Sequence, residues 1–351
     1  MGQCVVCGRE GRAVSEVLGL CADCLRAEKP QAMVRAAEVH RRARAEFALP
    51  EQPPTEGIRC GWCANDCRIP PGERGFCAVR CNEGGKLTGG TPRSGRVSWY
   101  HDPLPTNCVA DWVCEGHHQR GKTNLAVFYE SCSFDCLFCQ NWHYRERGAG
   151  RRLVSAEELA SAVDDGTECI CYFGGDPSTQ MAHALAASRL ALERHRVRVC
   201  WETNGAMSRA HIRAAAELSL RTGGCVKFDL KAHSPGIHLG LCGVGNERTL
   251  ENFRWVAALA RQRPEPPLLV ASTLLVPGYV DAREVEGIAR FIASLDRSIP
   301  YSLLGFHPDF LMPDLPRTSR HHAEECRQAA LAAGLERVHI GNVHILGPDC
   351  Y

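Results

Sequence analysis

Short apolar runs alternate with amphipathic stretches through the C-terminal two thirds of the chain. Six runs have the length of buried strands, at residues 125–129, 169–173, 197–201, 225–229, 268–276 and 301–306. Amphipathic stretches that predict helices lie at about 155–165, 177–195, 248–260, 281–295 and 318–333. A last strand is expected over 338–345. Repeated strand–helix pairs predict a parallel sheet with right-handed crossovers, so the fold class is α/β.

Three of these helices carry recognisable end signals. Ser155 and Glu158 have the spacing of a capping box, and Asp281 and Glu284 stand at the start of another helix. Gly334 follows the last helix and is expected to stop it. Upstream, a helix is predicted from about residue 30 to residue 47, followed by a proline-rich linker.

Composition narrows the class of protein. The 351 residues leave room for one large domain with appendages, and 44% hydrophobic residues suit a globular core. A net charge of +1 argues against a broad nucleic-acid surface. We find no apolar run long enough to span a membrane and no signal-peptide core, so we expect a cytoplasmic protein without a membrane partner. Thiols stay reduced in that compartment, so the 21 cysteines point to metal rather than to disulfides.

Three cysteines follow the first apolar run with the spacing CxxxCxxC: Cys132, Cys136 and Cys139. Iron–sulfur clusters are normally closed by four thiolates, so three local thiolates leave one iron open for a non-protein ligand. The loop would lie at the carboxyl end of a strand, where parallel α/β folds place their chemistry. The alternative is a structural zinc site with a distant fourth ligand, but zinc loops usually pair their cysteines as CxxC.

Polar groups recur where later strands end. Gly174, Gly175 and Asp176 follow the second run, and glycines there let the backbone approach a ligand closely. Asp176 and Pro177 also suit the start of a helix. The segments Glu-Thr-Asn-Gly at 202–205, Asp-Leu-Lys at 229–231 and Val-Pro-Gly at 276–278 follow three further strands, and His307 follows the sixth.

This ordered set of motifs resembles the radical S-adenosylmethionine (SAM) superfamily. Within it, the chain is most similar to the activating enzymes of glycyl-radical enzymes such as pyruvate formate-lyase, and to their relatives with a cysteine-rich N-terminal segment. The resemblance implies a partial (β/α)6 barrel and a [4Fe-4S] cluster on the catalytic cysteines Cys132, Cys136 and Cys139, whose open iron binds SAM. Asp176 replaces the glutamate of the family's Gly-Gly-Glu-Pro motif, which leaves its side-chain role open.

The resemblance also implies the residues that contact SAM. The glycine-rich turn would hold the methionine amino group, Lys231 its carboxylate, and Val276 the adenine. The implied set is Phe138, Gly174, Gly175, Asp176, Thr203, Asn204, Asp229, Lys231, Val276 and His307.

Two more groups of cysteines precede the predicted barrel. Cys4, Cys7, Cys21 and Cys24 form two CxxC pairs, the spacing of a zinc ribbon or a rubredoxin-like iron site. The second group resembles the cysteine-rich segment of the same superfamily branch. Zinc or an auxiliary iron–sulfur cluster would satisfy its four expected ligands, which are Cys60, Cys63, Cys67 and Cys77, with Cys81 as a spare.

We therefore expect four segments along the chain. They are a CxxC/CxxC metal module at 1–28, a helix and linker at 29–58, a second cysteine module at 59–119 and the barrel at 120–351. The stiff linker suggests that the first module is mobile. Cys108, Cys114, His117 and His118 would complete a metal site or serve as loop residues, and we favour the loop. Other cysteines fall in or beside barrel strands and are expected to be mostly small core residues.

The resemblance implies reductive cleavage of SAM to a 5′-deoxyadenosyl radical, which abstracts hydrogen from a C–H bond of a protein or peptide. We favour peptidyl C-methylation, for example of methyl-coenzyme M reductase, because the upstream cysteines lack the paired ferredoxin-like arrangement of activases with extra domains. No Asp-x-His-x-x-Gly cobalamin signature is present, so cobalamin would bind noncanonically. The alternatives are a glycyl-radical-enzyme activase or, as a non-enzyme, an iron–sulfur electron carrier or zinc-ribbon interaction protein. A ferredoxin or flavodoxin would supply the electron.

Overall fold

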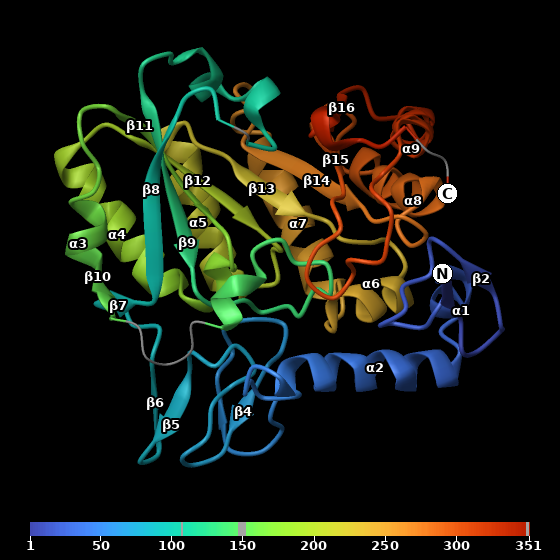
Figure 1. The fold of residues 1–351 in the computed structure, drawn as a ribbon. Coiled ribbons are helices and arrows are strands. Elements are labelled where there is room, and N and C mark those ends of the chain that lie inside the picture. The colour runs from blue at the N-terminus through green and yellow to red at the C-terminus, as the bar shows by residue number, and fades with distance from the viewer. Residues whose placement is uncertain (107, 147–151, 349–350) are drawn as a thin grey trace.

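The computed structural model describes residues 1–106, 108–146, 152–348 and 351. The described residues build an eight-stranded sheet in the order β16-β15-β14-β13-β12-β11-β9-β8 (Figure 1). Its strands are β8 (Val97–Pro103), β9 (Thr123–Tyr129), β11 (Thr167–Phe173), β12 (Arg198–Thr203), β13 (Val226–Asp229), β14 (Leu269–Leu275), β15 (Tyr301–Gly305) and β16 (Val338–Gly341). The strands from β9 to β16 are parallel, and β8 adds an antiparallel edge. The sheet is a partial barrel, open between its end strands, and it begins upstream of residue 120.

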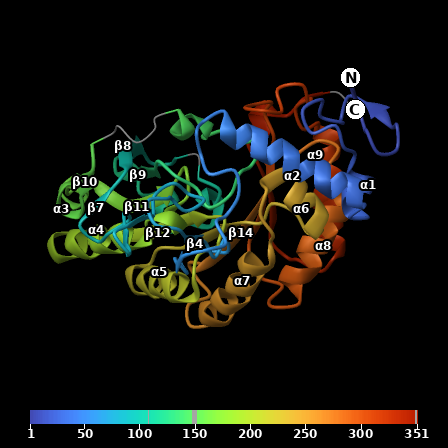
Figure 2. The same ribbon diagram turned by 90° about the horizontal axis from the view of Figure 1, so that it is seen from below.

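Helices cover the convex side of this curved sheet (Figures 1 and 2). They are α3 (Ala156–Ala160), α4 (Met181–Arg194), α5 (Arg209–Thr222), α6 (Pro235–Cys242), α7 (Glu247–Ala260), α8 (Ala282–Ala293) and α9 (Arg320–Ala332). Outward-facing aromatic side chains bind the two layers together. The Trp201 indole of β12 donates to the Ala215 carbonyl of α5 at 3.0 Å, and the Tyr172 hydroxyl of β11 lies 2.7 Å from that of Ser188 in α4.

The predicted strands and caps are largely confirmed. Ser155 accepts a hydrogen bond from the Glu158 N–H at 3.0 Å, and Asp281 accepts one from the Glu284 N–H at 3.1 Å. Three details differ. Helix α3 ends at Ala160, and α5 and α6 were not predicted. The last strand ends at Gly341 because the next residue has the left-handed φ of +54°, which turns the chain out of the sheet.

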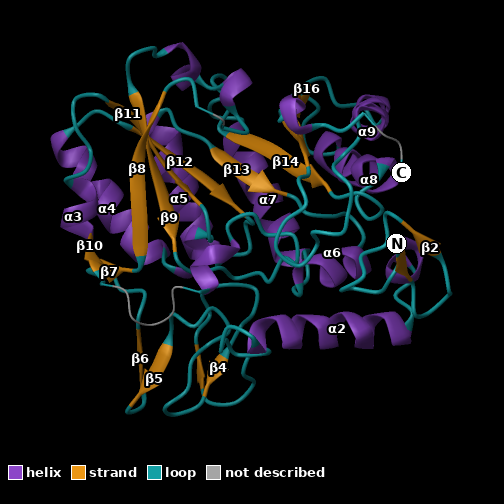
Figure 3. Cartoon of the chain, viewed as in Figure 1, coloured by secondary structure: helices purple, strands orange, loops and turns teal. Residues whose placement is uncertain are grey.

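The N-terminal part consists of short elements around one long helix (Figure 3). Helix α2 (Pro30–Ala45) runs from the first cysteine module, which contains α1 (Ala22–Arg26), to the second. The small strand pairs are β1 (Gly2–Gln3) with β2 (Glu10–Gly11), β3 (Ile58–Arg59) with β4 (Arg68–Ile69), β5 (Cys81–Glu83) with β6 (Lys86–Thr88), and β7 (Ser94–Gly95) with β10 (Val154–Ser155).

The first module is docked on the barrel, so the expectation that it is mobile is wrong. The Tyr279 hydroxyl, between β14 and α8, donates to the Leu20 carbonyl at 2.8 Å and accepts the Ser15 N–H at 3.0 Å. Arg26 of α1 pairs at 2.9 Å with Glu284, whose side chain is 1% exposed. Breaking a buried ion pair by removing one partner is strongly destabilising, and these contacts therefore hold the module against α8.

Among the described helices, none combines the length and the apolar character that crossing a membrane requires.

Candidate active site

The CxxxCxxC loop leaves the carboxyl end of β9, as the sequence predicts. Cys132 accepts a hydrogen bond from the backbone N–H of Phe134 at 3.3 Å. Helix α6 supports the loop, because the N–H groups of Asp135 and Leu137 donate to the last carbonyls of that helix at 2.9 and 3.0 Å. The unpredicted helix therefore fixes the backbone path of the loop.

The three thiols of the loop differ in their environments. Burial raises the pKa of Cys132 well above its usual value and that of Cys139 to about 11. A hydrogen bond with the Cys242 thiol of α6 lowers the pKa of Cys136. Buried thiolates are costly without a positive partner. A cationic iron centre would supply that partner, so this donor set fits a cluster.

The turn after β11 accepts only glycine at two successive positions. Gly174 has φ +70° and Gly175 has φ +55°. A Cβ on Gly174 would lie 1.8 Å from the Phe128 ring, and one on Gly175 would lie 1.9 Å from the Tyr129 carbonyl oxygen. The backbone of this turn therefore packs directly against the strand that leads to Cys132.

Asp176 is buried and joins three segments at this edge. Its N–H donates to the Ser131 carbonyl at 2.8 Å, and its carboxylate accepts the Asn204 N–H at 2.7 Å and the Thr203 hydroxyl at 3.1 Å. It also accepts the Ser178 N–H at 2.8 Å, which confirms the predicted cap. Burial raises the pKa of this carboxyl, and the hydrogen bonds oppose the rise. The Asp176 side chain thus connects the carboxyl ends of β11 and β12 by hydrogen bonds.

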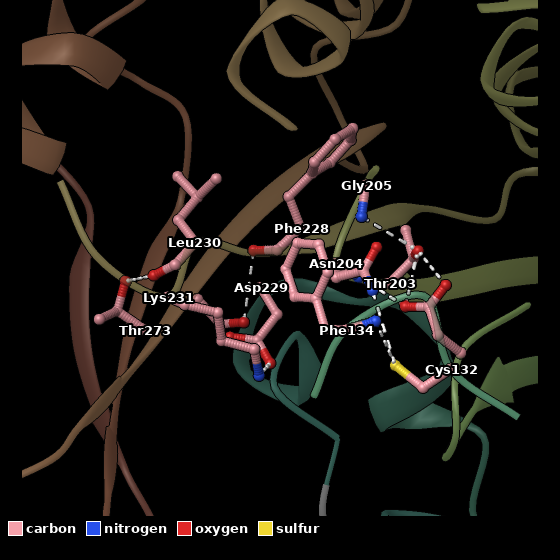
Figure 4. A network of polar contacts seen from close by, with 12 residues as sticks. Cys132, Phe134, Thr203, Asn204, Gly205, Phe228, Asp229, Leu230, Lys231 and Thr273 are labelled. Atoms are coloured by element: carbon pink, nitrogen blue, oxygen red, sulfur yellow. Dashed lines mark hydrogen bonds and ion pairs between the residues drawn. The ribbon is translucent and has the colours of Figure 1, made fainter. Parts of the chain in front are cut away.

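Asn204 links these hydrogen bonds to the CxxxCxxC loop (Figure 4). Its side-chain Nδ2 donates to the Ser133 hydroxyl at 2.9 Å and lies 3.8 Å from the Cys132 sulfur. Thr203 and Asn204 are 2% and 4% exposed, so the structure places both beside the loop and turns Thr203 toward Asp176.

Asp229, Lys231 and Phe138 meet on the other side of the loop. The Lys231 ammonium pairs with the Asp229 carboxylate and lies 5.5 Å from the centre of the Phe138 ring. Burial acts to lower the pKa of Lys231, but the carboxylate of Asp229 dominates with other anionic groups and raises it. Among the described residues, the second oxygen of Asp229 is buried without a hydrogen-bond partner. This orphaned acceptor suits a site that receives a polar ligand.

The two remaining predicted contacts follow later strands. Val276 is fully enclosed just after β14, and His307 is exposed just after β15. Their contact with SAM stays a prediction.

Comparison with known proteins decides the family. The model of the Radical SAM superfamily matches residues 126–292. The isethionate sulfite-lyase activating enzyme of Desulfovibrio desulfuricans is 38% identical over 257 residues, which cover 71% of this chain and 74% of that protein. The chain belongs to the radical SAM superfamily.

Two further relatives are more distant. An uncharacterized protein of Methanocaldococcus jannaschii is 26% identical over 293 residues, 82% of this chain and 81% of the relative. The pyruvate formate-lyase 1-activating enzyme of Escherichia coli is 26% identical over 193 residues, 52% of this chain and 75% of the relative.

Membership makes the chain a radical SAM enzyme, whose family implies a [4Fe-4S] cluster and SAM. The non-enzyme alternatives are set aside. The glycine cradle, the three loop cysteines and the orphaned carboxylate oxygen fit these groups.

Sequence reasoning missed Asp135, which stands between Cys132 and Cys136 in the CxxxCxxC loop. Its fully buried carboxylate lies 2.8 Å from His40 Nδ1 and 3.3 Å from Arg44 Nη1, both on α2, and also pairs with Arg145. Burial opposes ionisation, but the His40 and arginine contacts lower the pKa of Asp135. The position of Asp135 inside the motif could have indicated a role. No local sequence pattern indicates that its partners lie on α2, some 90 positions upstream.

The four cysteines of the first upstream group lie close together, as predicted. The ligand atoms of Cys4, Cys7, Cys21 and Cys24 lie within 4.8 Å of one another. A single ion with Zn–S bonds of about 2.3 Å holds its sulfurs within about 4 Å of each other. The spacing suits one tetrahedral ion, and zinc or iron remains the expectation.

The second upstream group surrounds a small pocket. Cys60, Cys63, Cys67 and Cys77 line it, together with Trp62 and Arg80. Cys81 instead pairs with Thr88 in the β5–β6 hairpin. The module lies beside the radical SAM loop, because Asn65 donates to the Ser133 carbonyl at 2.7 Å and Ala64 N–H to the Ala206 carbonyl at 2.8 Å. Metal binding there stays a prediction.

Proposed function

We propose that this radical SAM enzyme abstracts hydrogen from a protein substrate and leaves a glycyl radical, as an activating enzyme does. The observation that carries the proposal is the 38% identity with an isethionate sulfite-lyase activating enzyme across 74% of that protein. The organisation of the edge that bears the three loop cysteines supports it.

A bound [4Fe-4S] cluster and SAM supply one-electron cleavage of the SAM sulfonium and a 5′-deoxyadenosyl radical. Cys132, Cys136 and Cys139 would hold the cluster. The Lys231 ammonium would pair with the methionine carboxylate, at the cost of part of its present pairing with Asp229. Phe138 is 3% exposed and shields this side of the loop from water.

The surface next to the loop supports a macromolecular substrate. A pocket reaches Cys132 and is bounded on its other side by Cys77 of the second cysteine module. Arg74 and Arg96 also line it together with Glu130, whereas Arg44 and Arg145 in its wall are buried and pair with Asp135. A pocket between two modules suits an extended polypeptide better than an isolated small molecule, and Arg74 and Arg96 could donate to its carbonyl or carboxylate groups.

Peptidyl C-methylation requires the same hydrogen abstraction followed by methyl transfer. The names of the relatives favour the activation of a glycyl-radical enzyme. Detection of peptidyl C-methylation would replace this proposed reaction. The reductant would be a ferredoxin or flavodoxin.

The test is anaerobic turnover of the reconstituted protein with SAM and dithionite, using isethionate sulfite-lyase and pyruvate formate-lyase as substrates, with and without methylcobalamin. We expect 5′-deoxyadenosine and a glycyl radical detected by electron paramagnetic resonance (EPR). Cys132→Ala, Cys136→Ala and Cys139→Ala should each abolish 5′-deoxyadenosine formation, because two thiolates do not hold the cluster in its active form.

Near-normal SAM cleavage by any of these variants would contradict the role of the loop. Methylated peptide without a radical on either lyase would replace activation by C-methylation.

A further inference from the structure

A second set of thiols gathers inside the barrel at the opposite end of the sheet from the CxxxCxxC loop. Cys169 and Cys171 of β11, Cys200 of β12 and Cys225 just before β13 are all at least 93% buried. Cys171 and Cys200 are paired in the parallel register, so both point to the same face. These cysteines form one apolar cluster with Ala110 and Val270.

The segment between β8 and β9 brings two more cysteines to this end (Figure 1). It is pinned across the sheet, because the Trp112 indole donates to the Ser302 hydroxyl at 2.9 Å and that hydroxyl donates to the Val109 carbonyl at 2.7 Å. Cys108 and Cys114 of this segment line one pocket with the four strand cysteines. From the sequence, a loop role is expected for Cys108 and Cys114 and a core role for most of the strand cysteines, with one of the strand cysteines left open as a catalytic residue.

A buried ammonium group lies among these sulfurs. The Lys227 side chain is 1% exposed, and its Nζ donates to Cys108 Sγ at 3.0 Å and to Cys171 Sγ at 2.9 Å. Its carboxylate partner is Glu202, at 3.2 Å and 26% exposed. Neutral thiols are weak acceptors, and a buried charge is costly unless it is well paired. An ammonium group in this position would offset negative charge on the sulfurs of Cys108 and Cys171.

Cys108 and Cys114 also share a backbone pattern with a ligand of the radical SAM cluster. Cys108 accepts the N–H of Ala110 at 3.5 Å, and Cys114 accepts that of Gly116 at 3.3 Å. Cys132 likewise accepts the N–H found two residues later, at 3.3 Å. Hydrogen bonds to sulfur are a regular feature of iron–sulfur sites.

Hydrogen bonding separates four ligands from two supporting thiols. Cys169 donates its S–H to Asn124 Oδ1 at 3.3 Å, and Cys225 donates its S–H to Cys200, because their hydrogen bond raises the pKa of Cys225 and lowers that of Cys200. Cys108, Cys114, Cys171 and Cys200 remain, which is the number of thiolates that closes an iron–sulfur cluster.

We propose that Cys108, Cys114, Cys171 and Cys200 hold an auxiliary iron–sulfur cluster at the N-terminal end of the barrel, with Lys227 offsetting its negative charge. With four protein thiolates it has no open iron and does not bind SAM. The inference does not depend on the proposed substrate or reaction.

The test compares full-length protein, reconstituted anaerobically with iron and sulfide, with the double variant Cys108→Ser/Cys171→Ser. We expect the variant to lose four irons and four sulfides per chain for a cubane, or two of each for a [2Fe-2S] cluster. The loss should remove an EPR or Mössbauer component that is insensitive to SAM. The control is Cys326→Ser, a buried cysteine of α9 outside every cysteine group, which should keep the wild-type iron content.

Equal iron in wild type and double variant overturns the proposal. So does stoichiometric zinc at this site, or a disulfide between Cys200 and Cys225 in the reconstituted protein. If the double variant does not fold, Lys227→Met decides. It should keep its iron and shift the reduction potential of the SAM-insensitive component to a more negative value, and an unchanged potential overturns the assignment.

Discussion

Side chains around the CxxxCxxC loop divide into those that fasten it and those that face a ligand. Asp176 and Asn204 have their polar atoms engaged by neighbouring protein groups, so they set the shape of the edge. Asp229 keeps one buried oxygen without a partner among the described residues, and Lys231 stands beside it. A charged ligand would therefore be stabilised most by Asp229 and Lys231.

Lys231→Met tests this division at the level of one residue. A hydrogen bond to a charged group contributes about 1.5–3 kcal/mol, so SAM affinity should fall about ten- to a hundredfold. The iron content should not change, because Lys231 is not a ligand. The measurement is an anaerobic SAM titration, with the exposed lysine variant Lys86→Met as control. An unchanged dissociation constant would remove Lys231 from the site.

At the scale of an element, the turn after β11 sets the distance between two strands. Its two glycines have left-handed backbones, and the chain passes too close to β9 for any side chain. The cap by Asp176 then starts the chain into the 3-10 turn Pro177–Thr179 and α4. A short turn thereby fixes both the backbone that would receive SAM and the loop that carries Cys132.

Gly175→Ala tests the turn against a matched control. Gly72 also has a left-handed φ, +80°, but a Cβ there meets no atom within 4 Å. Gly72→Ala should lose only the conformational cost of about 1–2 kcal/mol and keep SAM cleavage. Gly175→Ala adds a clash with the Tyr129 carbonyl, so it should be less stable than Gly72→Ala and lose SAM binding. Thermal unfolding and 5′-deoxyadenosine assays measure both, and equal behaviour of the two variants would refute the steric argument.

At the scale of the whole molecule, the decisive feature is that both upstream cysteine modules pack against the barrel. The first module packs on α8, the second on the end of β12, and α2 joins them beneath the sheet (Figure 2). Asp135 ties α2 to the CxxxCxxC loop through His40 and Arg44. A change in either upstream module can therefore alter the geometry at Cys132.

Asp135→Asn measures this connection. Removing one partner of a buried ionic network costs about 3–5 kcal/mol, so unfolding should require less denaturant. The pKa of Asp135 is lowered by folding. Its contribution is therefore complete above the unfolded pKa of about 3.9 and is lost as the pH falls further, through the folded value. The stability gap between wild type and variant should therefore narrow below about pH 4.

The matched control is Glu286→Gln, which removes an exposed pair with Arg290 and should change stability by less than about 1 kcal/mol. A gap for Asp135→Asn no larger than that of the control would show that the network does not hold α2 to the loop.

Local sequence patterns determined much of this protein. Strand runs such as 125–129 and 169–173 alternate with capped helices, because buried strands and helix ends need particular residues at particular spacings. The cysteine loop and the strand-end motifs were equally readable, since a ligand set within one loop depends on short-range spacing. From them the superfamily, the fold class and the edge that bears the chemistry followed.

Tertiary structure alone decided which distant residues meet. The ring of thiols formed by Cys108, Cys171 and Cys200 spans more than 90 positions, and parallel register brings its members to one face. The docking of Arg26 on Glu284 and the convergence of His40 on Asp135 are likewise invisible locally. Such contacts depend on how strands align and helices pack, and a local pattern encodes which face is buried but not what it is buried against.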